Sequence, residues 1–200
     1  MTPFYKFVRG IAKFVVAVFF REKCYGLENL PQAGSYVLCS NHTSLMDVAF
    51  LIAHTNRQIF FMAKQELFNI PVIGFIITKL GAFPVVRGGG AGPALQKAQE
   101  ILNAGNVLGI FPEGTRKYTG APARGKAGAA LLASACKKDV LPVSIYHNGR
   151  LHIFSKVCVR FGNVISYNEI RVENEPTRND IRRITDIIMN NITSMWEKEF

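Results

Sequence analysis

The chain has 200 residues, of which 48% are hydrophobic and 19% are charged, and this balance excludes an intrinsically disordered protein. The length suits one domain that buries its own core without disulfides or metal ions. The formal net charge of +10 indicates an acidic partner, and nucleic acid and anionic lipid are the usual candidates. The four cysteines are widely spaced and form no Cys-x-x-Cys pair, which favours buried free thiols in a reducing compartment.

The N-terminal segment Phe4–Phe20 is almost entirely apolar, and we predict that it forms an amphipathic helix. Its three cations, Lys6, Arg9 and Lys13, fall within one arc of roughly 60°, because successive helical residues are about 100° apart. A helix of about 17 residues is roughly 25 Å long, which is short for a membrane crossing. We expect the helix to lie in the membrane interface with its basic face toward anionic head groups. A helix docked on its own domain is the competing interpretation.

Strand-like and helix-like stretches alternate after a short linker that contains Gly26 and Pro31. Strands are predicted at Ser35–Cys39, Gln58–Met62, Ala82–Val86, Val107–Phe111 and Val140–Ile145, and a hairpin at Leu151–Phe154 and Lys156–Phe161. Helices are predicted at Ser44–Ala53, from Pro93 to Gly105, at Gly125–Lys138 and from near Thr177, with an apolar stretch at Pro71–Leu80. This alternation predicts an α/β domain with a mostly parallel central sheet covered by helices on both faces. We assign residues 1–25 to the interface helix and residues 26–200 to the domain.

Four polar clusters follow predicted strands at the points where those strands end. They are Asn41–Asp47, Lys64, Arg87 and Phe111–Arg116. Ligands of open α/β sheets bind outside the carboxyl ends of the strands, so we expect these clusters to lie around one site. A histidine base beside a wall of cations is what acyl transfer onto the hydroxyl of a phosphate-bearing acceptor requires.

The first cluster offers a base in His42 and a carboxylate in Asp47, five residues later. In a continuous helix the two side chains would point about 140° apart, so they meet only if His42 lies in the loop before the first turn. There the ring could accept a proton while Asp47 fixes its tautomer. Ser44-x-x-Asp47 also fits a variant of the capping box, and these residues alone leave both roles open.

The other clusters supply cations that suit an anion. Arg116 can grip a phosphate with two parallel hydrogen bonds, and Arg87 and Lys64 are further candidates, although a single cation at a strand end is usually solvated surface. Gly114 allows close approach of the backbone to a ligand. Glu113 is interpreted as an acceptor for a substrate hydroxyl, an orienting partner for an arginine, or a surface ion pair. The run Gly88–Gly92 lacks the order of a P-loop and is expected to be a lid or turn.

The order of these motifs resembles the four-block pattern of the glycerolipid acyltransferases, and most of all the bacterial lysophosphatidic acid (1-acylglycerol-3-phosphate) acyltransferases. The four blocks are His42-x4-Asp47, Gly81–Arg87, Phe111–Arg116 and Val140–Val143. The resemblance implies that His42 is the general base and that Asp47 supports it. It also implies a phosphate and glycerol site at Lys64, Arg87, Glu113, Gly114, Thr115 and Arg116, and a role for Pro142 in shaping the acyl site.

The implied reaction moves an acyl chain from acyl-CoA or acyl carrier protein to the sn-2 hydroxyl of 1-acyl-glycerol-3-phosphate, which yields phosphatidic acid for phospholipid synthesis. We expect no cofactor beyond the thioester, no metal ion because the four histidines lack ligand spacing, and no nucleic-acid partner. The expected location is the cytoplasmic face of the cell membrane, as a peripheral or monotopic protein. The alternatives are an acyltransferase for glycerol-3-phosphate or another lysophospholipid, and a phospholipid-binding peripheral protein without catalysis.

Overall fold

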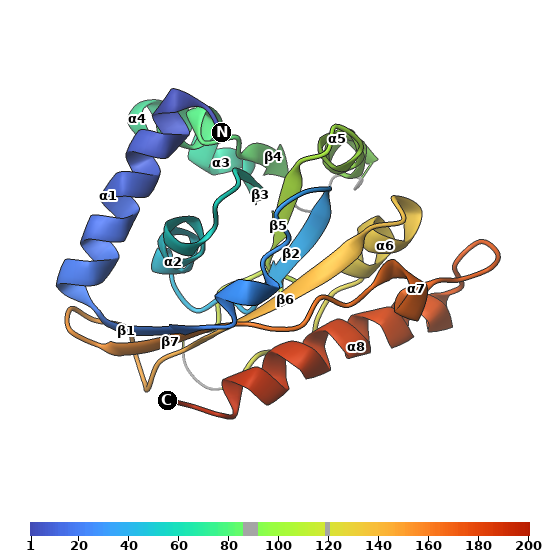
Figure 1. Cartoon of the computed structure of the whole chain (residues 1–200). Helices are drawn as coiled ribbons and strands as arrows, with labels where there is room; N and C mark the ends of the chain where they lie inside the picture. Colours follow the sequence, from blue (N-terminus) through green and yellow to red (C-terminus); the bar gives the residue numbers. More distant parts are fainter. Residues whose placement is uncertain (86–91, 119–120) are drawn as a thin grey trace.

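A seven-stranded sheet forms the centre of the molecule in the computed structural model, which describes residues 1–85, 92–118 and 121–200. The strand order is β1-β7-β6-β2-β5-β3-β4 (Figure 1). The bounds are β1 Arg21–Tyr25, β2 Tyr36–Ser40, β3 Ile59–Lys64, β4 Phe83–Val85, β5 Val107–Ile110, β6 Asp139–Tyr146 and β7 Lys156–Phe161. Neighbouring strands are parallel except β6 and β7, so β7 and its partner β1 run against the rest.

Helices cover both faces of this sheet (Figure 1). Helices α1 (Pro3–Phe19) and α2 (Met46–His54) lie over one face, and α5 (Gly92–Asn103), α6 (Gly128–Ala135) and α8 (Arg178–Trp196) over the other. The shorter elements are η1 (Leu27–Asn29), α3 (Gln65–Phe68), α4 (Pro71–Lys79) and α7 (Tyr167–Ile170). The mostly parallel sheet between two helical layers, predicted from the sequence, is confirmed.

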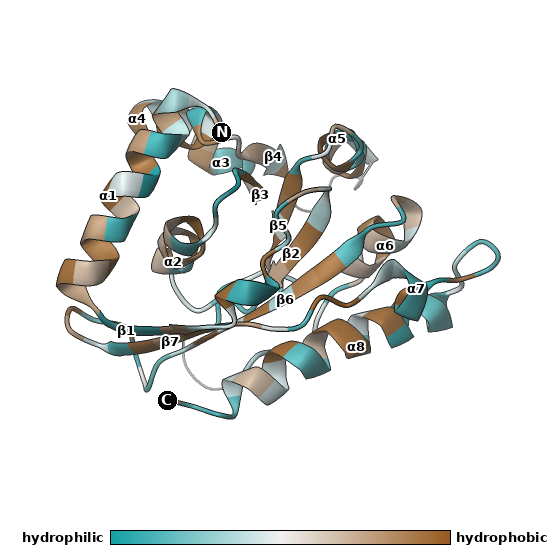
Figure 2. Ribbon diagram, in the orientation of Figure 1, coloured by the Kyte–Doolittle hydropathy of each residue, from teal (hydrophilic) through white to brown (hydrophobic). Residues whose placement is uncertain are grey.

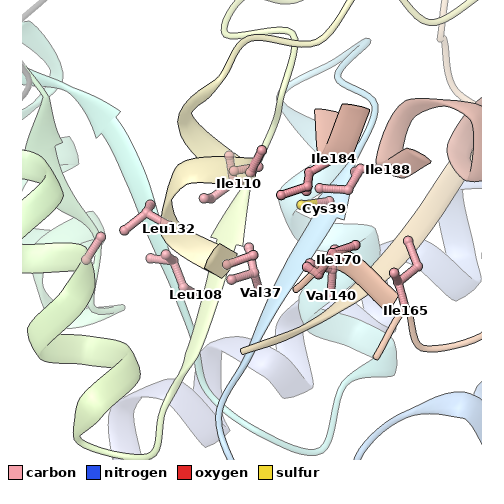
Figure 3. Close-up of a cluster of buried hydrophobic side chains, with 14 of the residues drawn as sticks. Val37, Cys39, Leu108, Ile110, Leu132, Val140, Ile165, Ile170, Ile184 and Ile188 are labelled. Carbon is pink, nitrogen blue, oxygen red and sulfur yellow. The ribbon is translucent and has the colours of Figure 1, made fainter. Parts of the chain in front are cut away.

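The central strands are buried on both faces, which explains why they read as continuous apolar runs. Every residue of β2 and β5 is buried, and Figure 2 shows these strands as largely hydrophobic. On the side of α8, Cys39 of β2 lies close to Ile184 and Ile188 of that helix (Figure 3), and Val37 belongs to the same buried cluster. Gly109 in β5 leaves the space that the Phe61 ring fills, since a Cβ there would lie 2.4 Å from that ring.

Helix α8 closes the far face through a regular apolar stripe. Ile181, Ile184, Ile188 and Ile192 are all buried at helical spacing. The helix begins with a capping box in which Thr177 and Asp180 satisfy each other's backbone N–H groups. The predicted start near Thr177 is therefore confirmed, and the helix anchors the carboxyl-terminal part of the chain to the sheet.

Helix α1 is docked on its own domain, as the competing interpretation of the sequence held. Tyr5, Ala12 and Val16 are buried, and the Tyr5 hydroxyl accepts the backbone N–H of Ile59 at 3.0 Å. Arg9 donates to the side chain of Asn56 at 2.8 Å. The expectation that the whole basic face turns to lipid head groups is therefore wrong for Arg9, because this arc adjoins the docked stripe. Within the described part of the chain, no helix is both long and apolar enough to span a bilayer.

Two segments differ from the sequence-based expectation. Residues 21–25, which we placed with the N-terminal helix, form the edge strand β1 instead, because α1 ends at Phe19 and β1 pairs in parallel with β7. The hairpin is also wrong: residues 151–154 form no strand, and β7 pairs antiparallel with β6. Phe154 has a φ of 65°, which breaks an extended chain just before β7 begins.

All four cysteines are free thiols, as expected. Cys39 and Cys158 are buried, whereas Cys24 and Cys136 are only half-buried. Burial raises the pKa of the Cys24 thiol to about 12, so this sulfur stays protonated and unreactive near neutral pH.

Candidate active site

His42 lies in the loop between β2 and α2, before the first helical turn, which is the position that the contact with Asp47 requires. Its Nδ1 lies 2.8 Å from Oδ2 of Asp47. Asp47 sits in the first turn of α2 and is fully buried, whereas 17% of the His42 side chain is exposed. The ring therefore has one nitrogen on a buried carboxylate while part of it reaches solvent.

The Asp47 carboxylate receives several donors besides His42. Its Oδ2 accepts the backbone N–H groups of Thr43 at 2.6 Å and Ser44 at 2.8 Å, and the Thr43 hydroxyl lies 3.1 Å from its Oδ1. A carboxylate only accepts hydrogen bonds, so Nδ1 of His42 carries the proton and Nε2 is the proton acceptor of the ring. Ser44 in turn accepts the backbone N–H of Met46. Asp47 thus orders the start of α2 and orients His42 at the same time.

The plane of the His42 ring is fixed by an aromatic side chain that the sequence reasoning did not single out. Phe111, directly after β5, stacks on His42 with ring centroids 3.9 Å apart and planes 15° apart. Phe61 of β3 stacks in turn on Phe111 at 5.7 Å. The available signal was the phenylalanine that opens the Phe111–Arg116 motif directly after a buried strand.

The loop after β5 binds the backbone of His42 on both sides. Oε1 of Glu113 accepts the His42 N–H at 2.8 Å, and the backbone N–H of Lys117 donates to the His42 carbonyl at 2.8 Å. Oε2 of Glu113 accepts the N–H of Ala123 at 2.8 Å. Burial raises the pKa of the Glu113 carboxyl, and these two N–H groups partly offset that effect. Glu113 thus braces the loop of the base; its expected contact with substrate stays a prediction.

Asn41 fixes the end of β2 to the end of β6. Its side chain accepts the N–H of Ile145 and donates to the Ile145 carbonyl, both at 2.8 Å. A side-chain amide that replaces one step of a strand ladder is difficult to recognise in a sequence, because asparagine after a strand usually indicates a turn.

Two of the predicted cations, Lys64 and Arg116, lie at the same edge of the sheet as His42, since β2, β5 and β3 are parallel neighbours. Lys64 is exposed at the end of β3. Thr115 and Arg116 are exposed after β5, and the Arg116 guanidinium lies 5.7 Å from the centre of the Tyr118 ring. Arg87 and the glycines at 88–90 lie outside the described residues. Lys64 and Arg116 are therefore on the expected edge, and their contact with an anion stays a prediction.

Gly114 adopts a φ of +70°, a conformation that residues with a Cβ rarely adopt. A Cβ at this position would lie 3.0 Å from Nζ of Lys126. The Lys126 backbone N–H also donates to the Pro112 carbonyl at 2.8 Å. The turn of the third motif therefore brings a further lysine beside the loop that holds His42.

Pro142 lies inside β6, buried and in register with Cys39 of β2. A Cβ placed on Gly162 would lie 3.0 Å from the Pro142 Cγ and 3.0 Å from the Met195 side chain of α8. Pro142 therefore points toward α8, and its role at an acyl site stays a prediction.

The sequence model of the acyltransferase family matches residues 21–146, which include every part of this site. The chain belongs to the acyltransferase family. It is 33% identical over 141 residues to the 1-acyl-sn-glycerol-3-phosphate acyltransferase of Bacillus subtilis, and the match covers 70% of each chain. A chloroplastic relative from Arabidopsis thaliana with the same activity in its name is 31% identical over 153 residues, which cover 73% of this chain and 43% of the relative.

The fold agrees with that of a solved acyltransferase. The crystal structure of the 1-acyl-sn-glycerophosphate acyltransferase from Thermotoga maritima aligns with a TM-score of 0.76 and 24% identity, over 98% of this chain and 80% of that one. The arrangement of strands and helices is therefore that of this solved structure. The match to the family model and to the relatives confirms the family resemblance drawn from the four motifs.

Proposed function

We propose that this protein transfers an acyl chain from an acyl thioester to the sn-2 hydroxyl of 1-acyl-glycerol-3-phosphate, forming phosphatidate for phospholipid synthesis. The observation that carries the proposal is the His42–Asp47 pair, with the Nε2 of His42 as proton acceptor and the loop that carries Arg116 bonded to the His42 backbone. The relatives named for this activity support the choice of acceptor.

In the proposed mechanism, Nε2 of His42 removes the proton of the acceptor hydroxyl as its oxygen attacks the thioester carbonyl. Asp47 stabilises the imidazolium that forms. The tetrahedral intermediate then expels the thiolate, and the imidazolium returns the proton to that sulfur. The products are the ester and a free thiol. The co-substrate is acyl-CoA or acyl carrier protein, and the reaction as written requires neither another cofactor nor a metal ion.

The exposed cations at the same sheet edge are proposed to hold the acceptor phosphate. Arg116 is the first candidate because its guanidinium offers paired donors, and Lys64 is the second. Arg87, which lies outside the described residues, is a third candidate from the sequence motif. Backbone around Gly114 and Thr115 would border the oxyanion, and Pro142 would shape the acyl site. Because Glu113 already accepts two backbone N–H groups, a contact with the glycerol would use its remaining lone pairs.

We also propose that α1 and α4 together form the membrane-binding surface. On α1, the exposed fractions are 66% for Phe7 and 64% for Phe14, and on α4 they are 70% for Val72 and 59% for Phe75. The two helices meet through Phe4 and Phe75, whose ring centroids are 6.5 Å apart. Adjacent exposed apolar faces of this kind are typical of membrane-docking sites. The free cysteines support a location on the cytoplasmic face.

Vesicle flotation tests the membrane surface. Replacing Phe14 and Phe75 by serine should move most of the protein from phospholipid vesicles to the soluble fraction, because each buried aromatic side chain contributes about 1.5–3 kcal/mol. Leu131→Ser is the control, since Leu131 is 39% exposed on α6, which covers the opposite face of the sheet from α1. Unchanged flotation of the double variant would show that another surface binds the bilayer.

Thiol release from acyl-CoA, with and without lysophosphatidate, tests the activity. Wild type should release thiol and form phosphatidate only when both substrates are present, and His42→Ala should reduce the rate at least about a hundredfold, the smallest typical effect of losing a general base. His54→Ala is the matched control, because His54 also bonds a carboxylate, Glu22 at 2.8 Å, at the other end of α2.

The possible outcomes separate the alternatives. Release without lysophosphatidate would indicate a thioesterase, and near-normal turnover of His42→Ala would exclude the mechanism. A panel of glycerol-3-phosphate and other lysophospholipids distinguishes the acceptors, with acyl carrier protein tried as the donor in parallel. Vesicle binding without turnover on any of these pairs would favour a non-catalytic lipid-binding protein.

A further inference from the structure

A second histidine, His147, lies beside the pair formed by His42 and Asp47. The ends of β2 and β6 are joined by the two hydrogen bonds between Asn41 and Ile145. Thr43 and His147 each follow this pair by two residues, and Nε2 of His147 lies 2.8 Å from the Thr43 hydroxyl. The same clamp that ends the two strands therefore places His147 on the loop that holds the base.

A continuous chain of contacts leads from His147 to His42. The Thr43 hydroxyl lies 3.1 Å from Oδ1 of Asp47, and the other oxygen of Asp47 lies 2.8 Å from Nδ1 of His42. On its far side, Nδ1 of His147 lies 3.0 Å from the Gly149 carbonyl. His147 is buried, with 7% of its surface exposed, so its ring is held within this arrangement.

This series of contacts contains fewer hydrogen atoms than it would need to form every hydrogen bond at once. The Gly149 carbonyl only accepts, so Nδ1 of His147 carries a hydrogen, and in the neutral ring Nε2 must accept the hydroxyl proton of Thr43. That proton is then not available to Asp47. When His147 gains a second proton, Nε2 becomes a donor and the Thr43 hydroxyl turns its hydrogen to Asp47. The state of His147 thus determines how many donors Asp47 has.

We propose that His147 is a positioning residue for the base: it sets the direction of the Thr43 hydroxyl and thereby the hydrogen bonding of the Asp47 carboxylate that supports His42. This inference rests on the proposed function, in which His42 removes the acceptor proton. A carboxylate with one donor fewer holds the His42 imidazolium more strongly, so the neutral His147 favours proton removal.

A double-mutant cycle of His147→Leu and Thr43→Val tests the proposal. His147→Leu should lower kcat about threefold to tenfold, the size of one hydrogen bond, with little change in KM for either substrate. His147→Gln should recover most of the rate, because its amide can bond the hydroxyl. The effect of His147→Leu should vanish in the Thr43→Val background, since the hydroxyl that carries it is absent. His152→Leu, an exposed histidine, is the control.

Additive losses in the cycle would overturn the proposal, because they would show that His147 does not act through Thr43. A second readout, the NMR signal of the His42 Nδ1 proton, does not depend on turnover. This signal should shift between wild type and His147→Leu, but it should not shift between Thr43→Val and the double variant. An unshifted signal in a folded His147→Leu protein would also overturn it. Absence of transfer by wild type, with the signal shifting as expected, would contradict the proposed function and not the arrangement of these residues.

Discussion

Glu113 offers a sharp test of the difference between a structural brace and a substrate contact. Sequence reasoning interpreted this glutamate as a partner of the substrate, whereas in the structure both carboxylate oxygens accept backbone N–H groups, from His42 and Ala123. The substitution Glu113→Gln keeps the shape and one acceptor oxygen but turns an NH₂ group toward one of these donors. We expect a less stable protein with a misplaced base.

The expected size follows from the bonds that are lost. A hydrogen bond to a charged group contributes about 1.5–3 kcal/mol, and Glu113→Gln loses one such bond and weakens the other. For a domain of this size, that loss lowers the thermal midpoint by about 3–12 °C. Because the His42 backbone is held less firmly, kcat should fall as well, whereas KM for lysophosphatidate should change little.

Thermal unfolding and steady-state kinetics on the same preparations provide the measurement. Glu100→Gln is the control: Glu100 is an exposed glutamate that pairs with Lys97 at 2.9 Å, and its loss should cost less than about 0.5 kcal/mol. A rise of several-fold in KM with an unchanged midpoint would refute the brace and restore the substrate contact that the sequence suggested.

Three further predictions concern neighbouring residues. Phe111→Leu should lower kcat roughly twofold to tenfold in the thiol-release assay by removing the ring stacked on His42. Gly114→Ala should lower the thermal midpoint, since the left-handed conformation costs about 1–2 kcal/mol for a residue with a Cβ, and it should also reduce activity. Gly34→Ala is the control: Gly34 has a φ of +75° but open space around it, so this variant should lower the midpoint without reducing activity. Burial lowers the pKa of His147 from its ordinary value of 6.5, although the Asp47 charge opposes this shift. As the pH drops below about 6.5, the unfolded chain therefore binds this proton before the folded protein does, and stability falls. Thermal midpoints measured from pH 7 to 5 should fall less steeply in His147→Leu than in wild type.

The fold was predictable from the sequence wherever both faces of an element are buried. The runs at β2, β5 and β6 are apolar because helices cover both sides of them, and the alternation with helical stretches then indicates a parallel sheet. Strand β1 was missed because its sequence, Arg21–Tyr25, mixes charged and polar residues at an edge that is half exposed. The pairing of β1 with β7 joins segments more than 130 residues apart, which local patterns do not reveal.

The members of the candidate site were predictable as residue types, but their connections were not. His42 and Asp47 were found because their spacing allows contact only across the start of a helix, and the contact is present. Three connections were not predicted: the bond from Glu113 to the His42 backbone, the bonds from Asn41 to the Ile145 backbone, and the bond between His147 and Thr43. Each joins residues that are 71 to 104 positions apart in the sequence. Such partners follow from the strand order, and one sequence does not specify that order uniquely.

The position of α4 links the two parts of the proposed function. Strand β3 ends at Lys64, and α3 and α4 follow it directly, so the exposed apolar side chains of α4 begin at the sheet edge that carries the candidate site. A lysolipid has its phosphate and free hydroxyl close to the bilayer surface and its acyl chain within the bilayer. A domain that rests on the membrane through α1 and α4 would therefore meet the head group at the edge where His42 and the cations lie. Docking would bring the acceptor hydroxyl to the base while most of the lipid stays in the membrane, which removes the cost of extracting it.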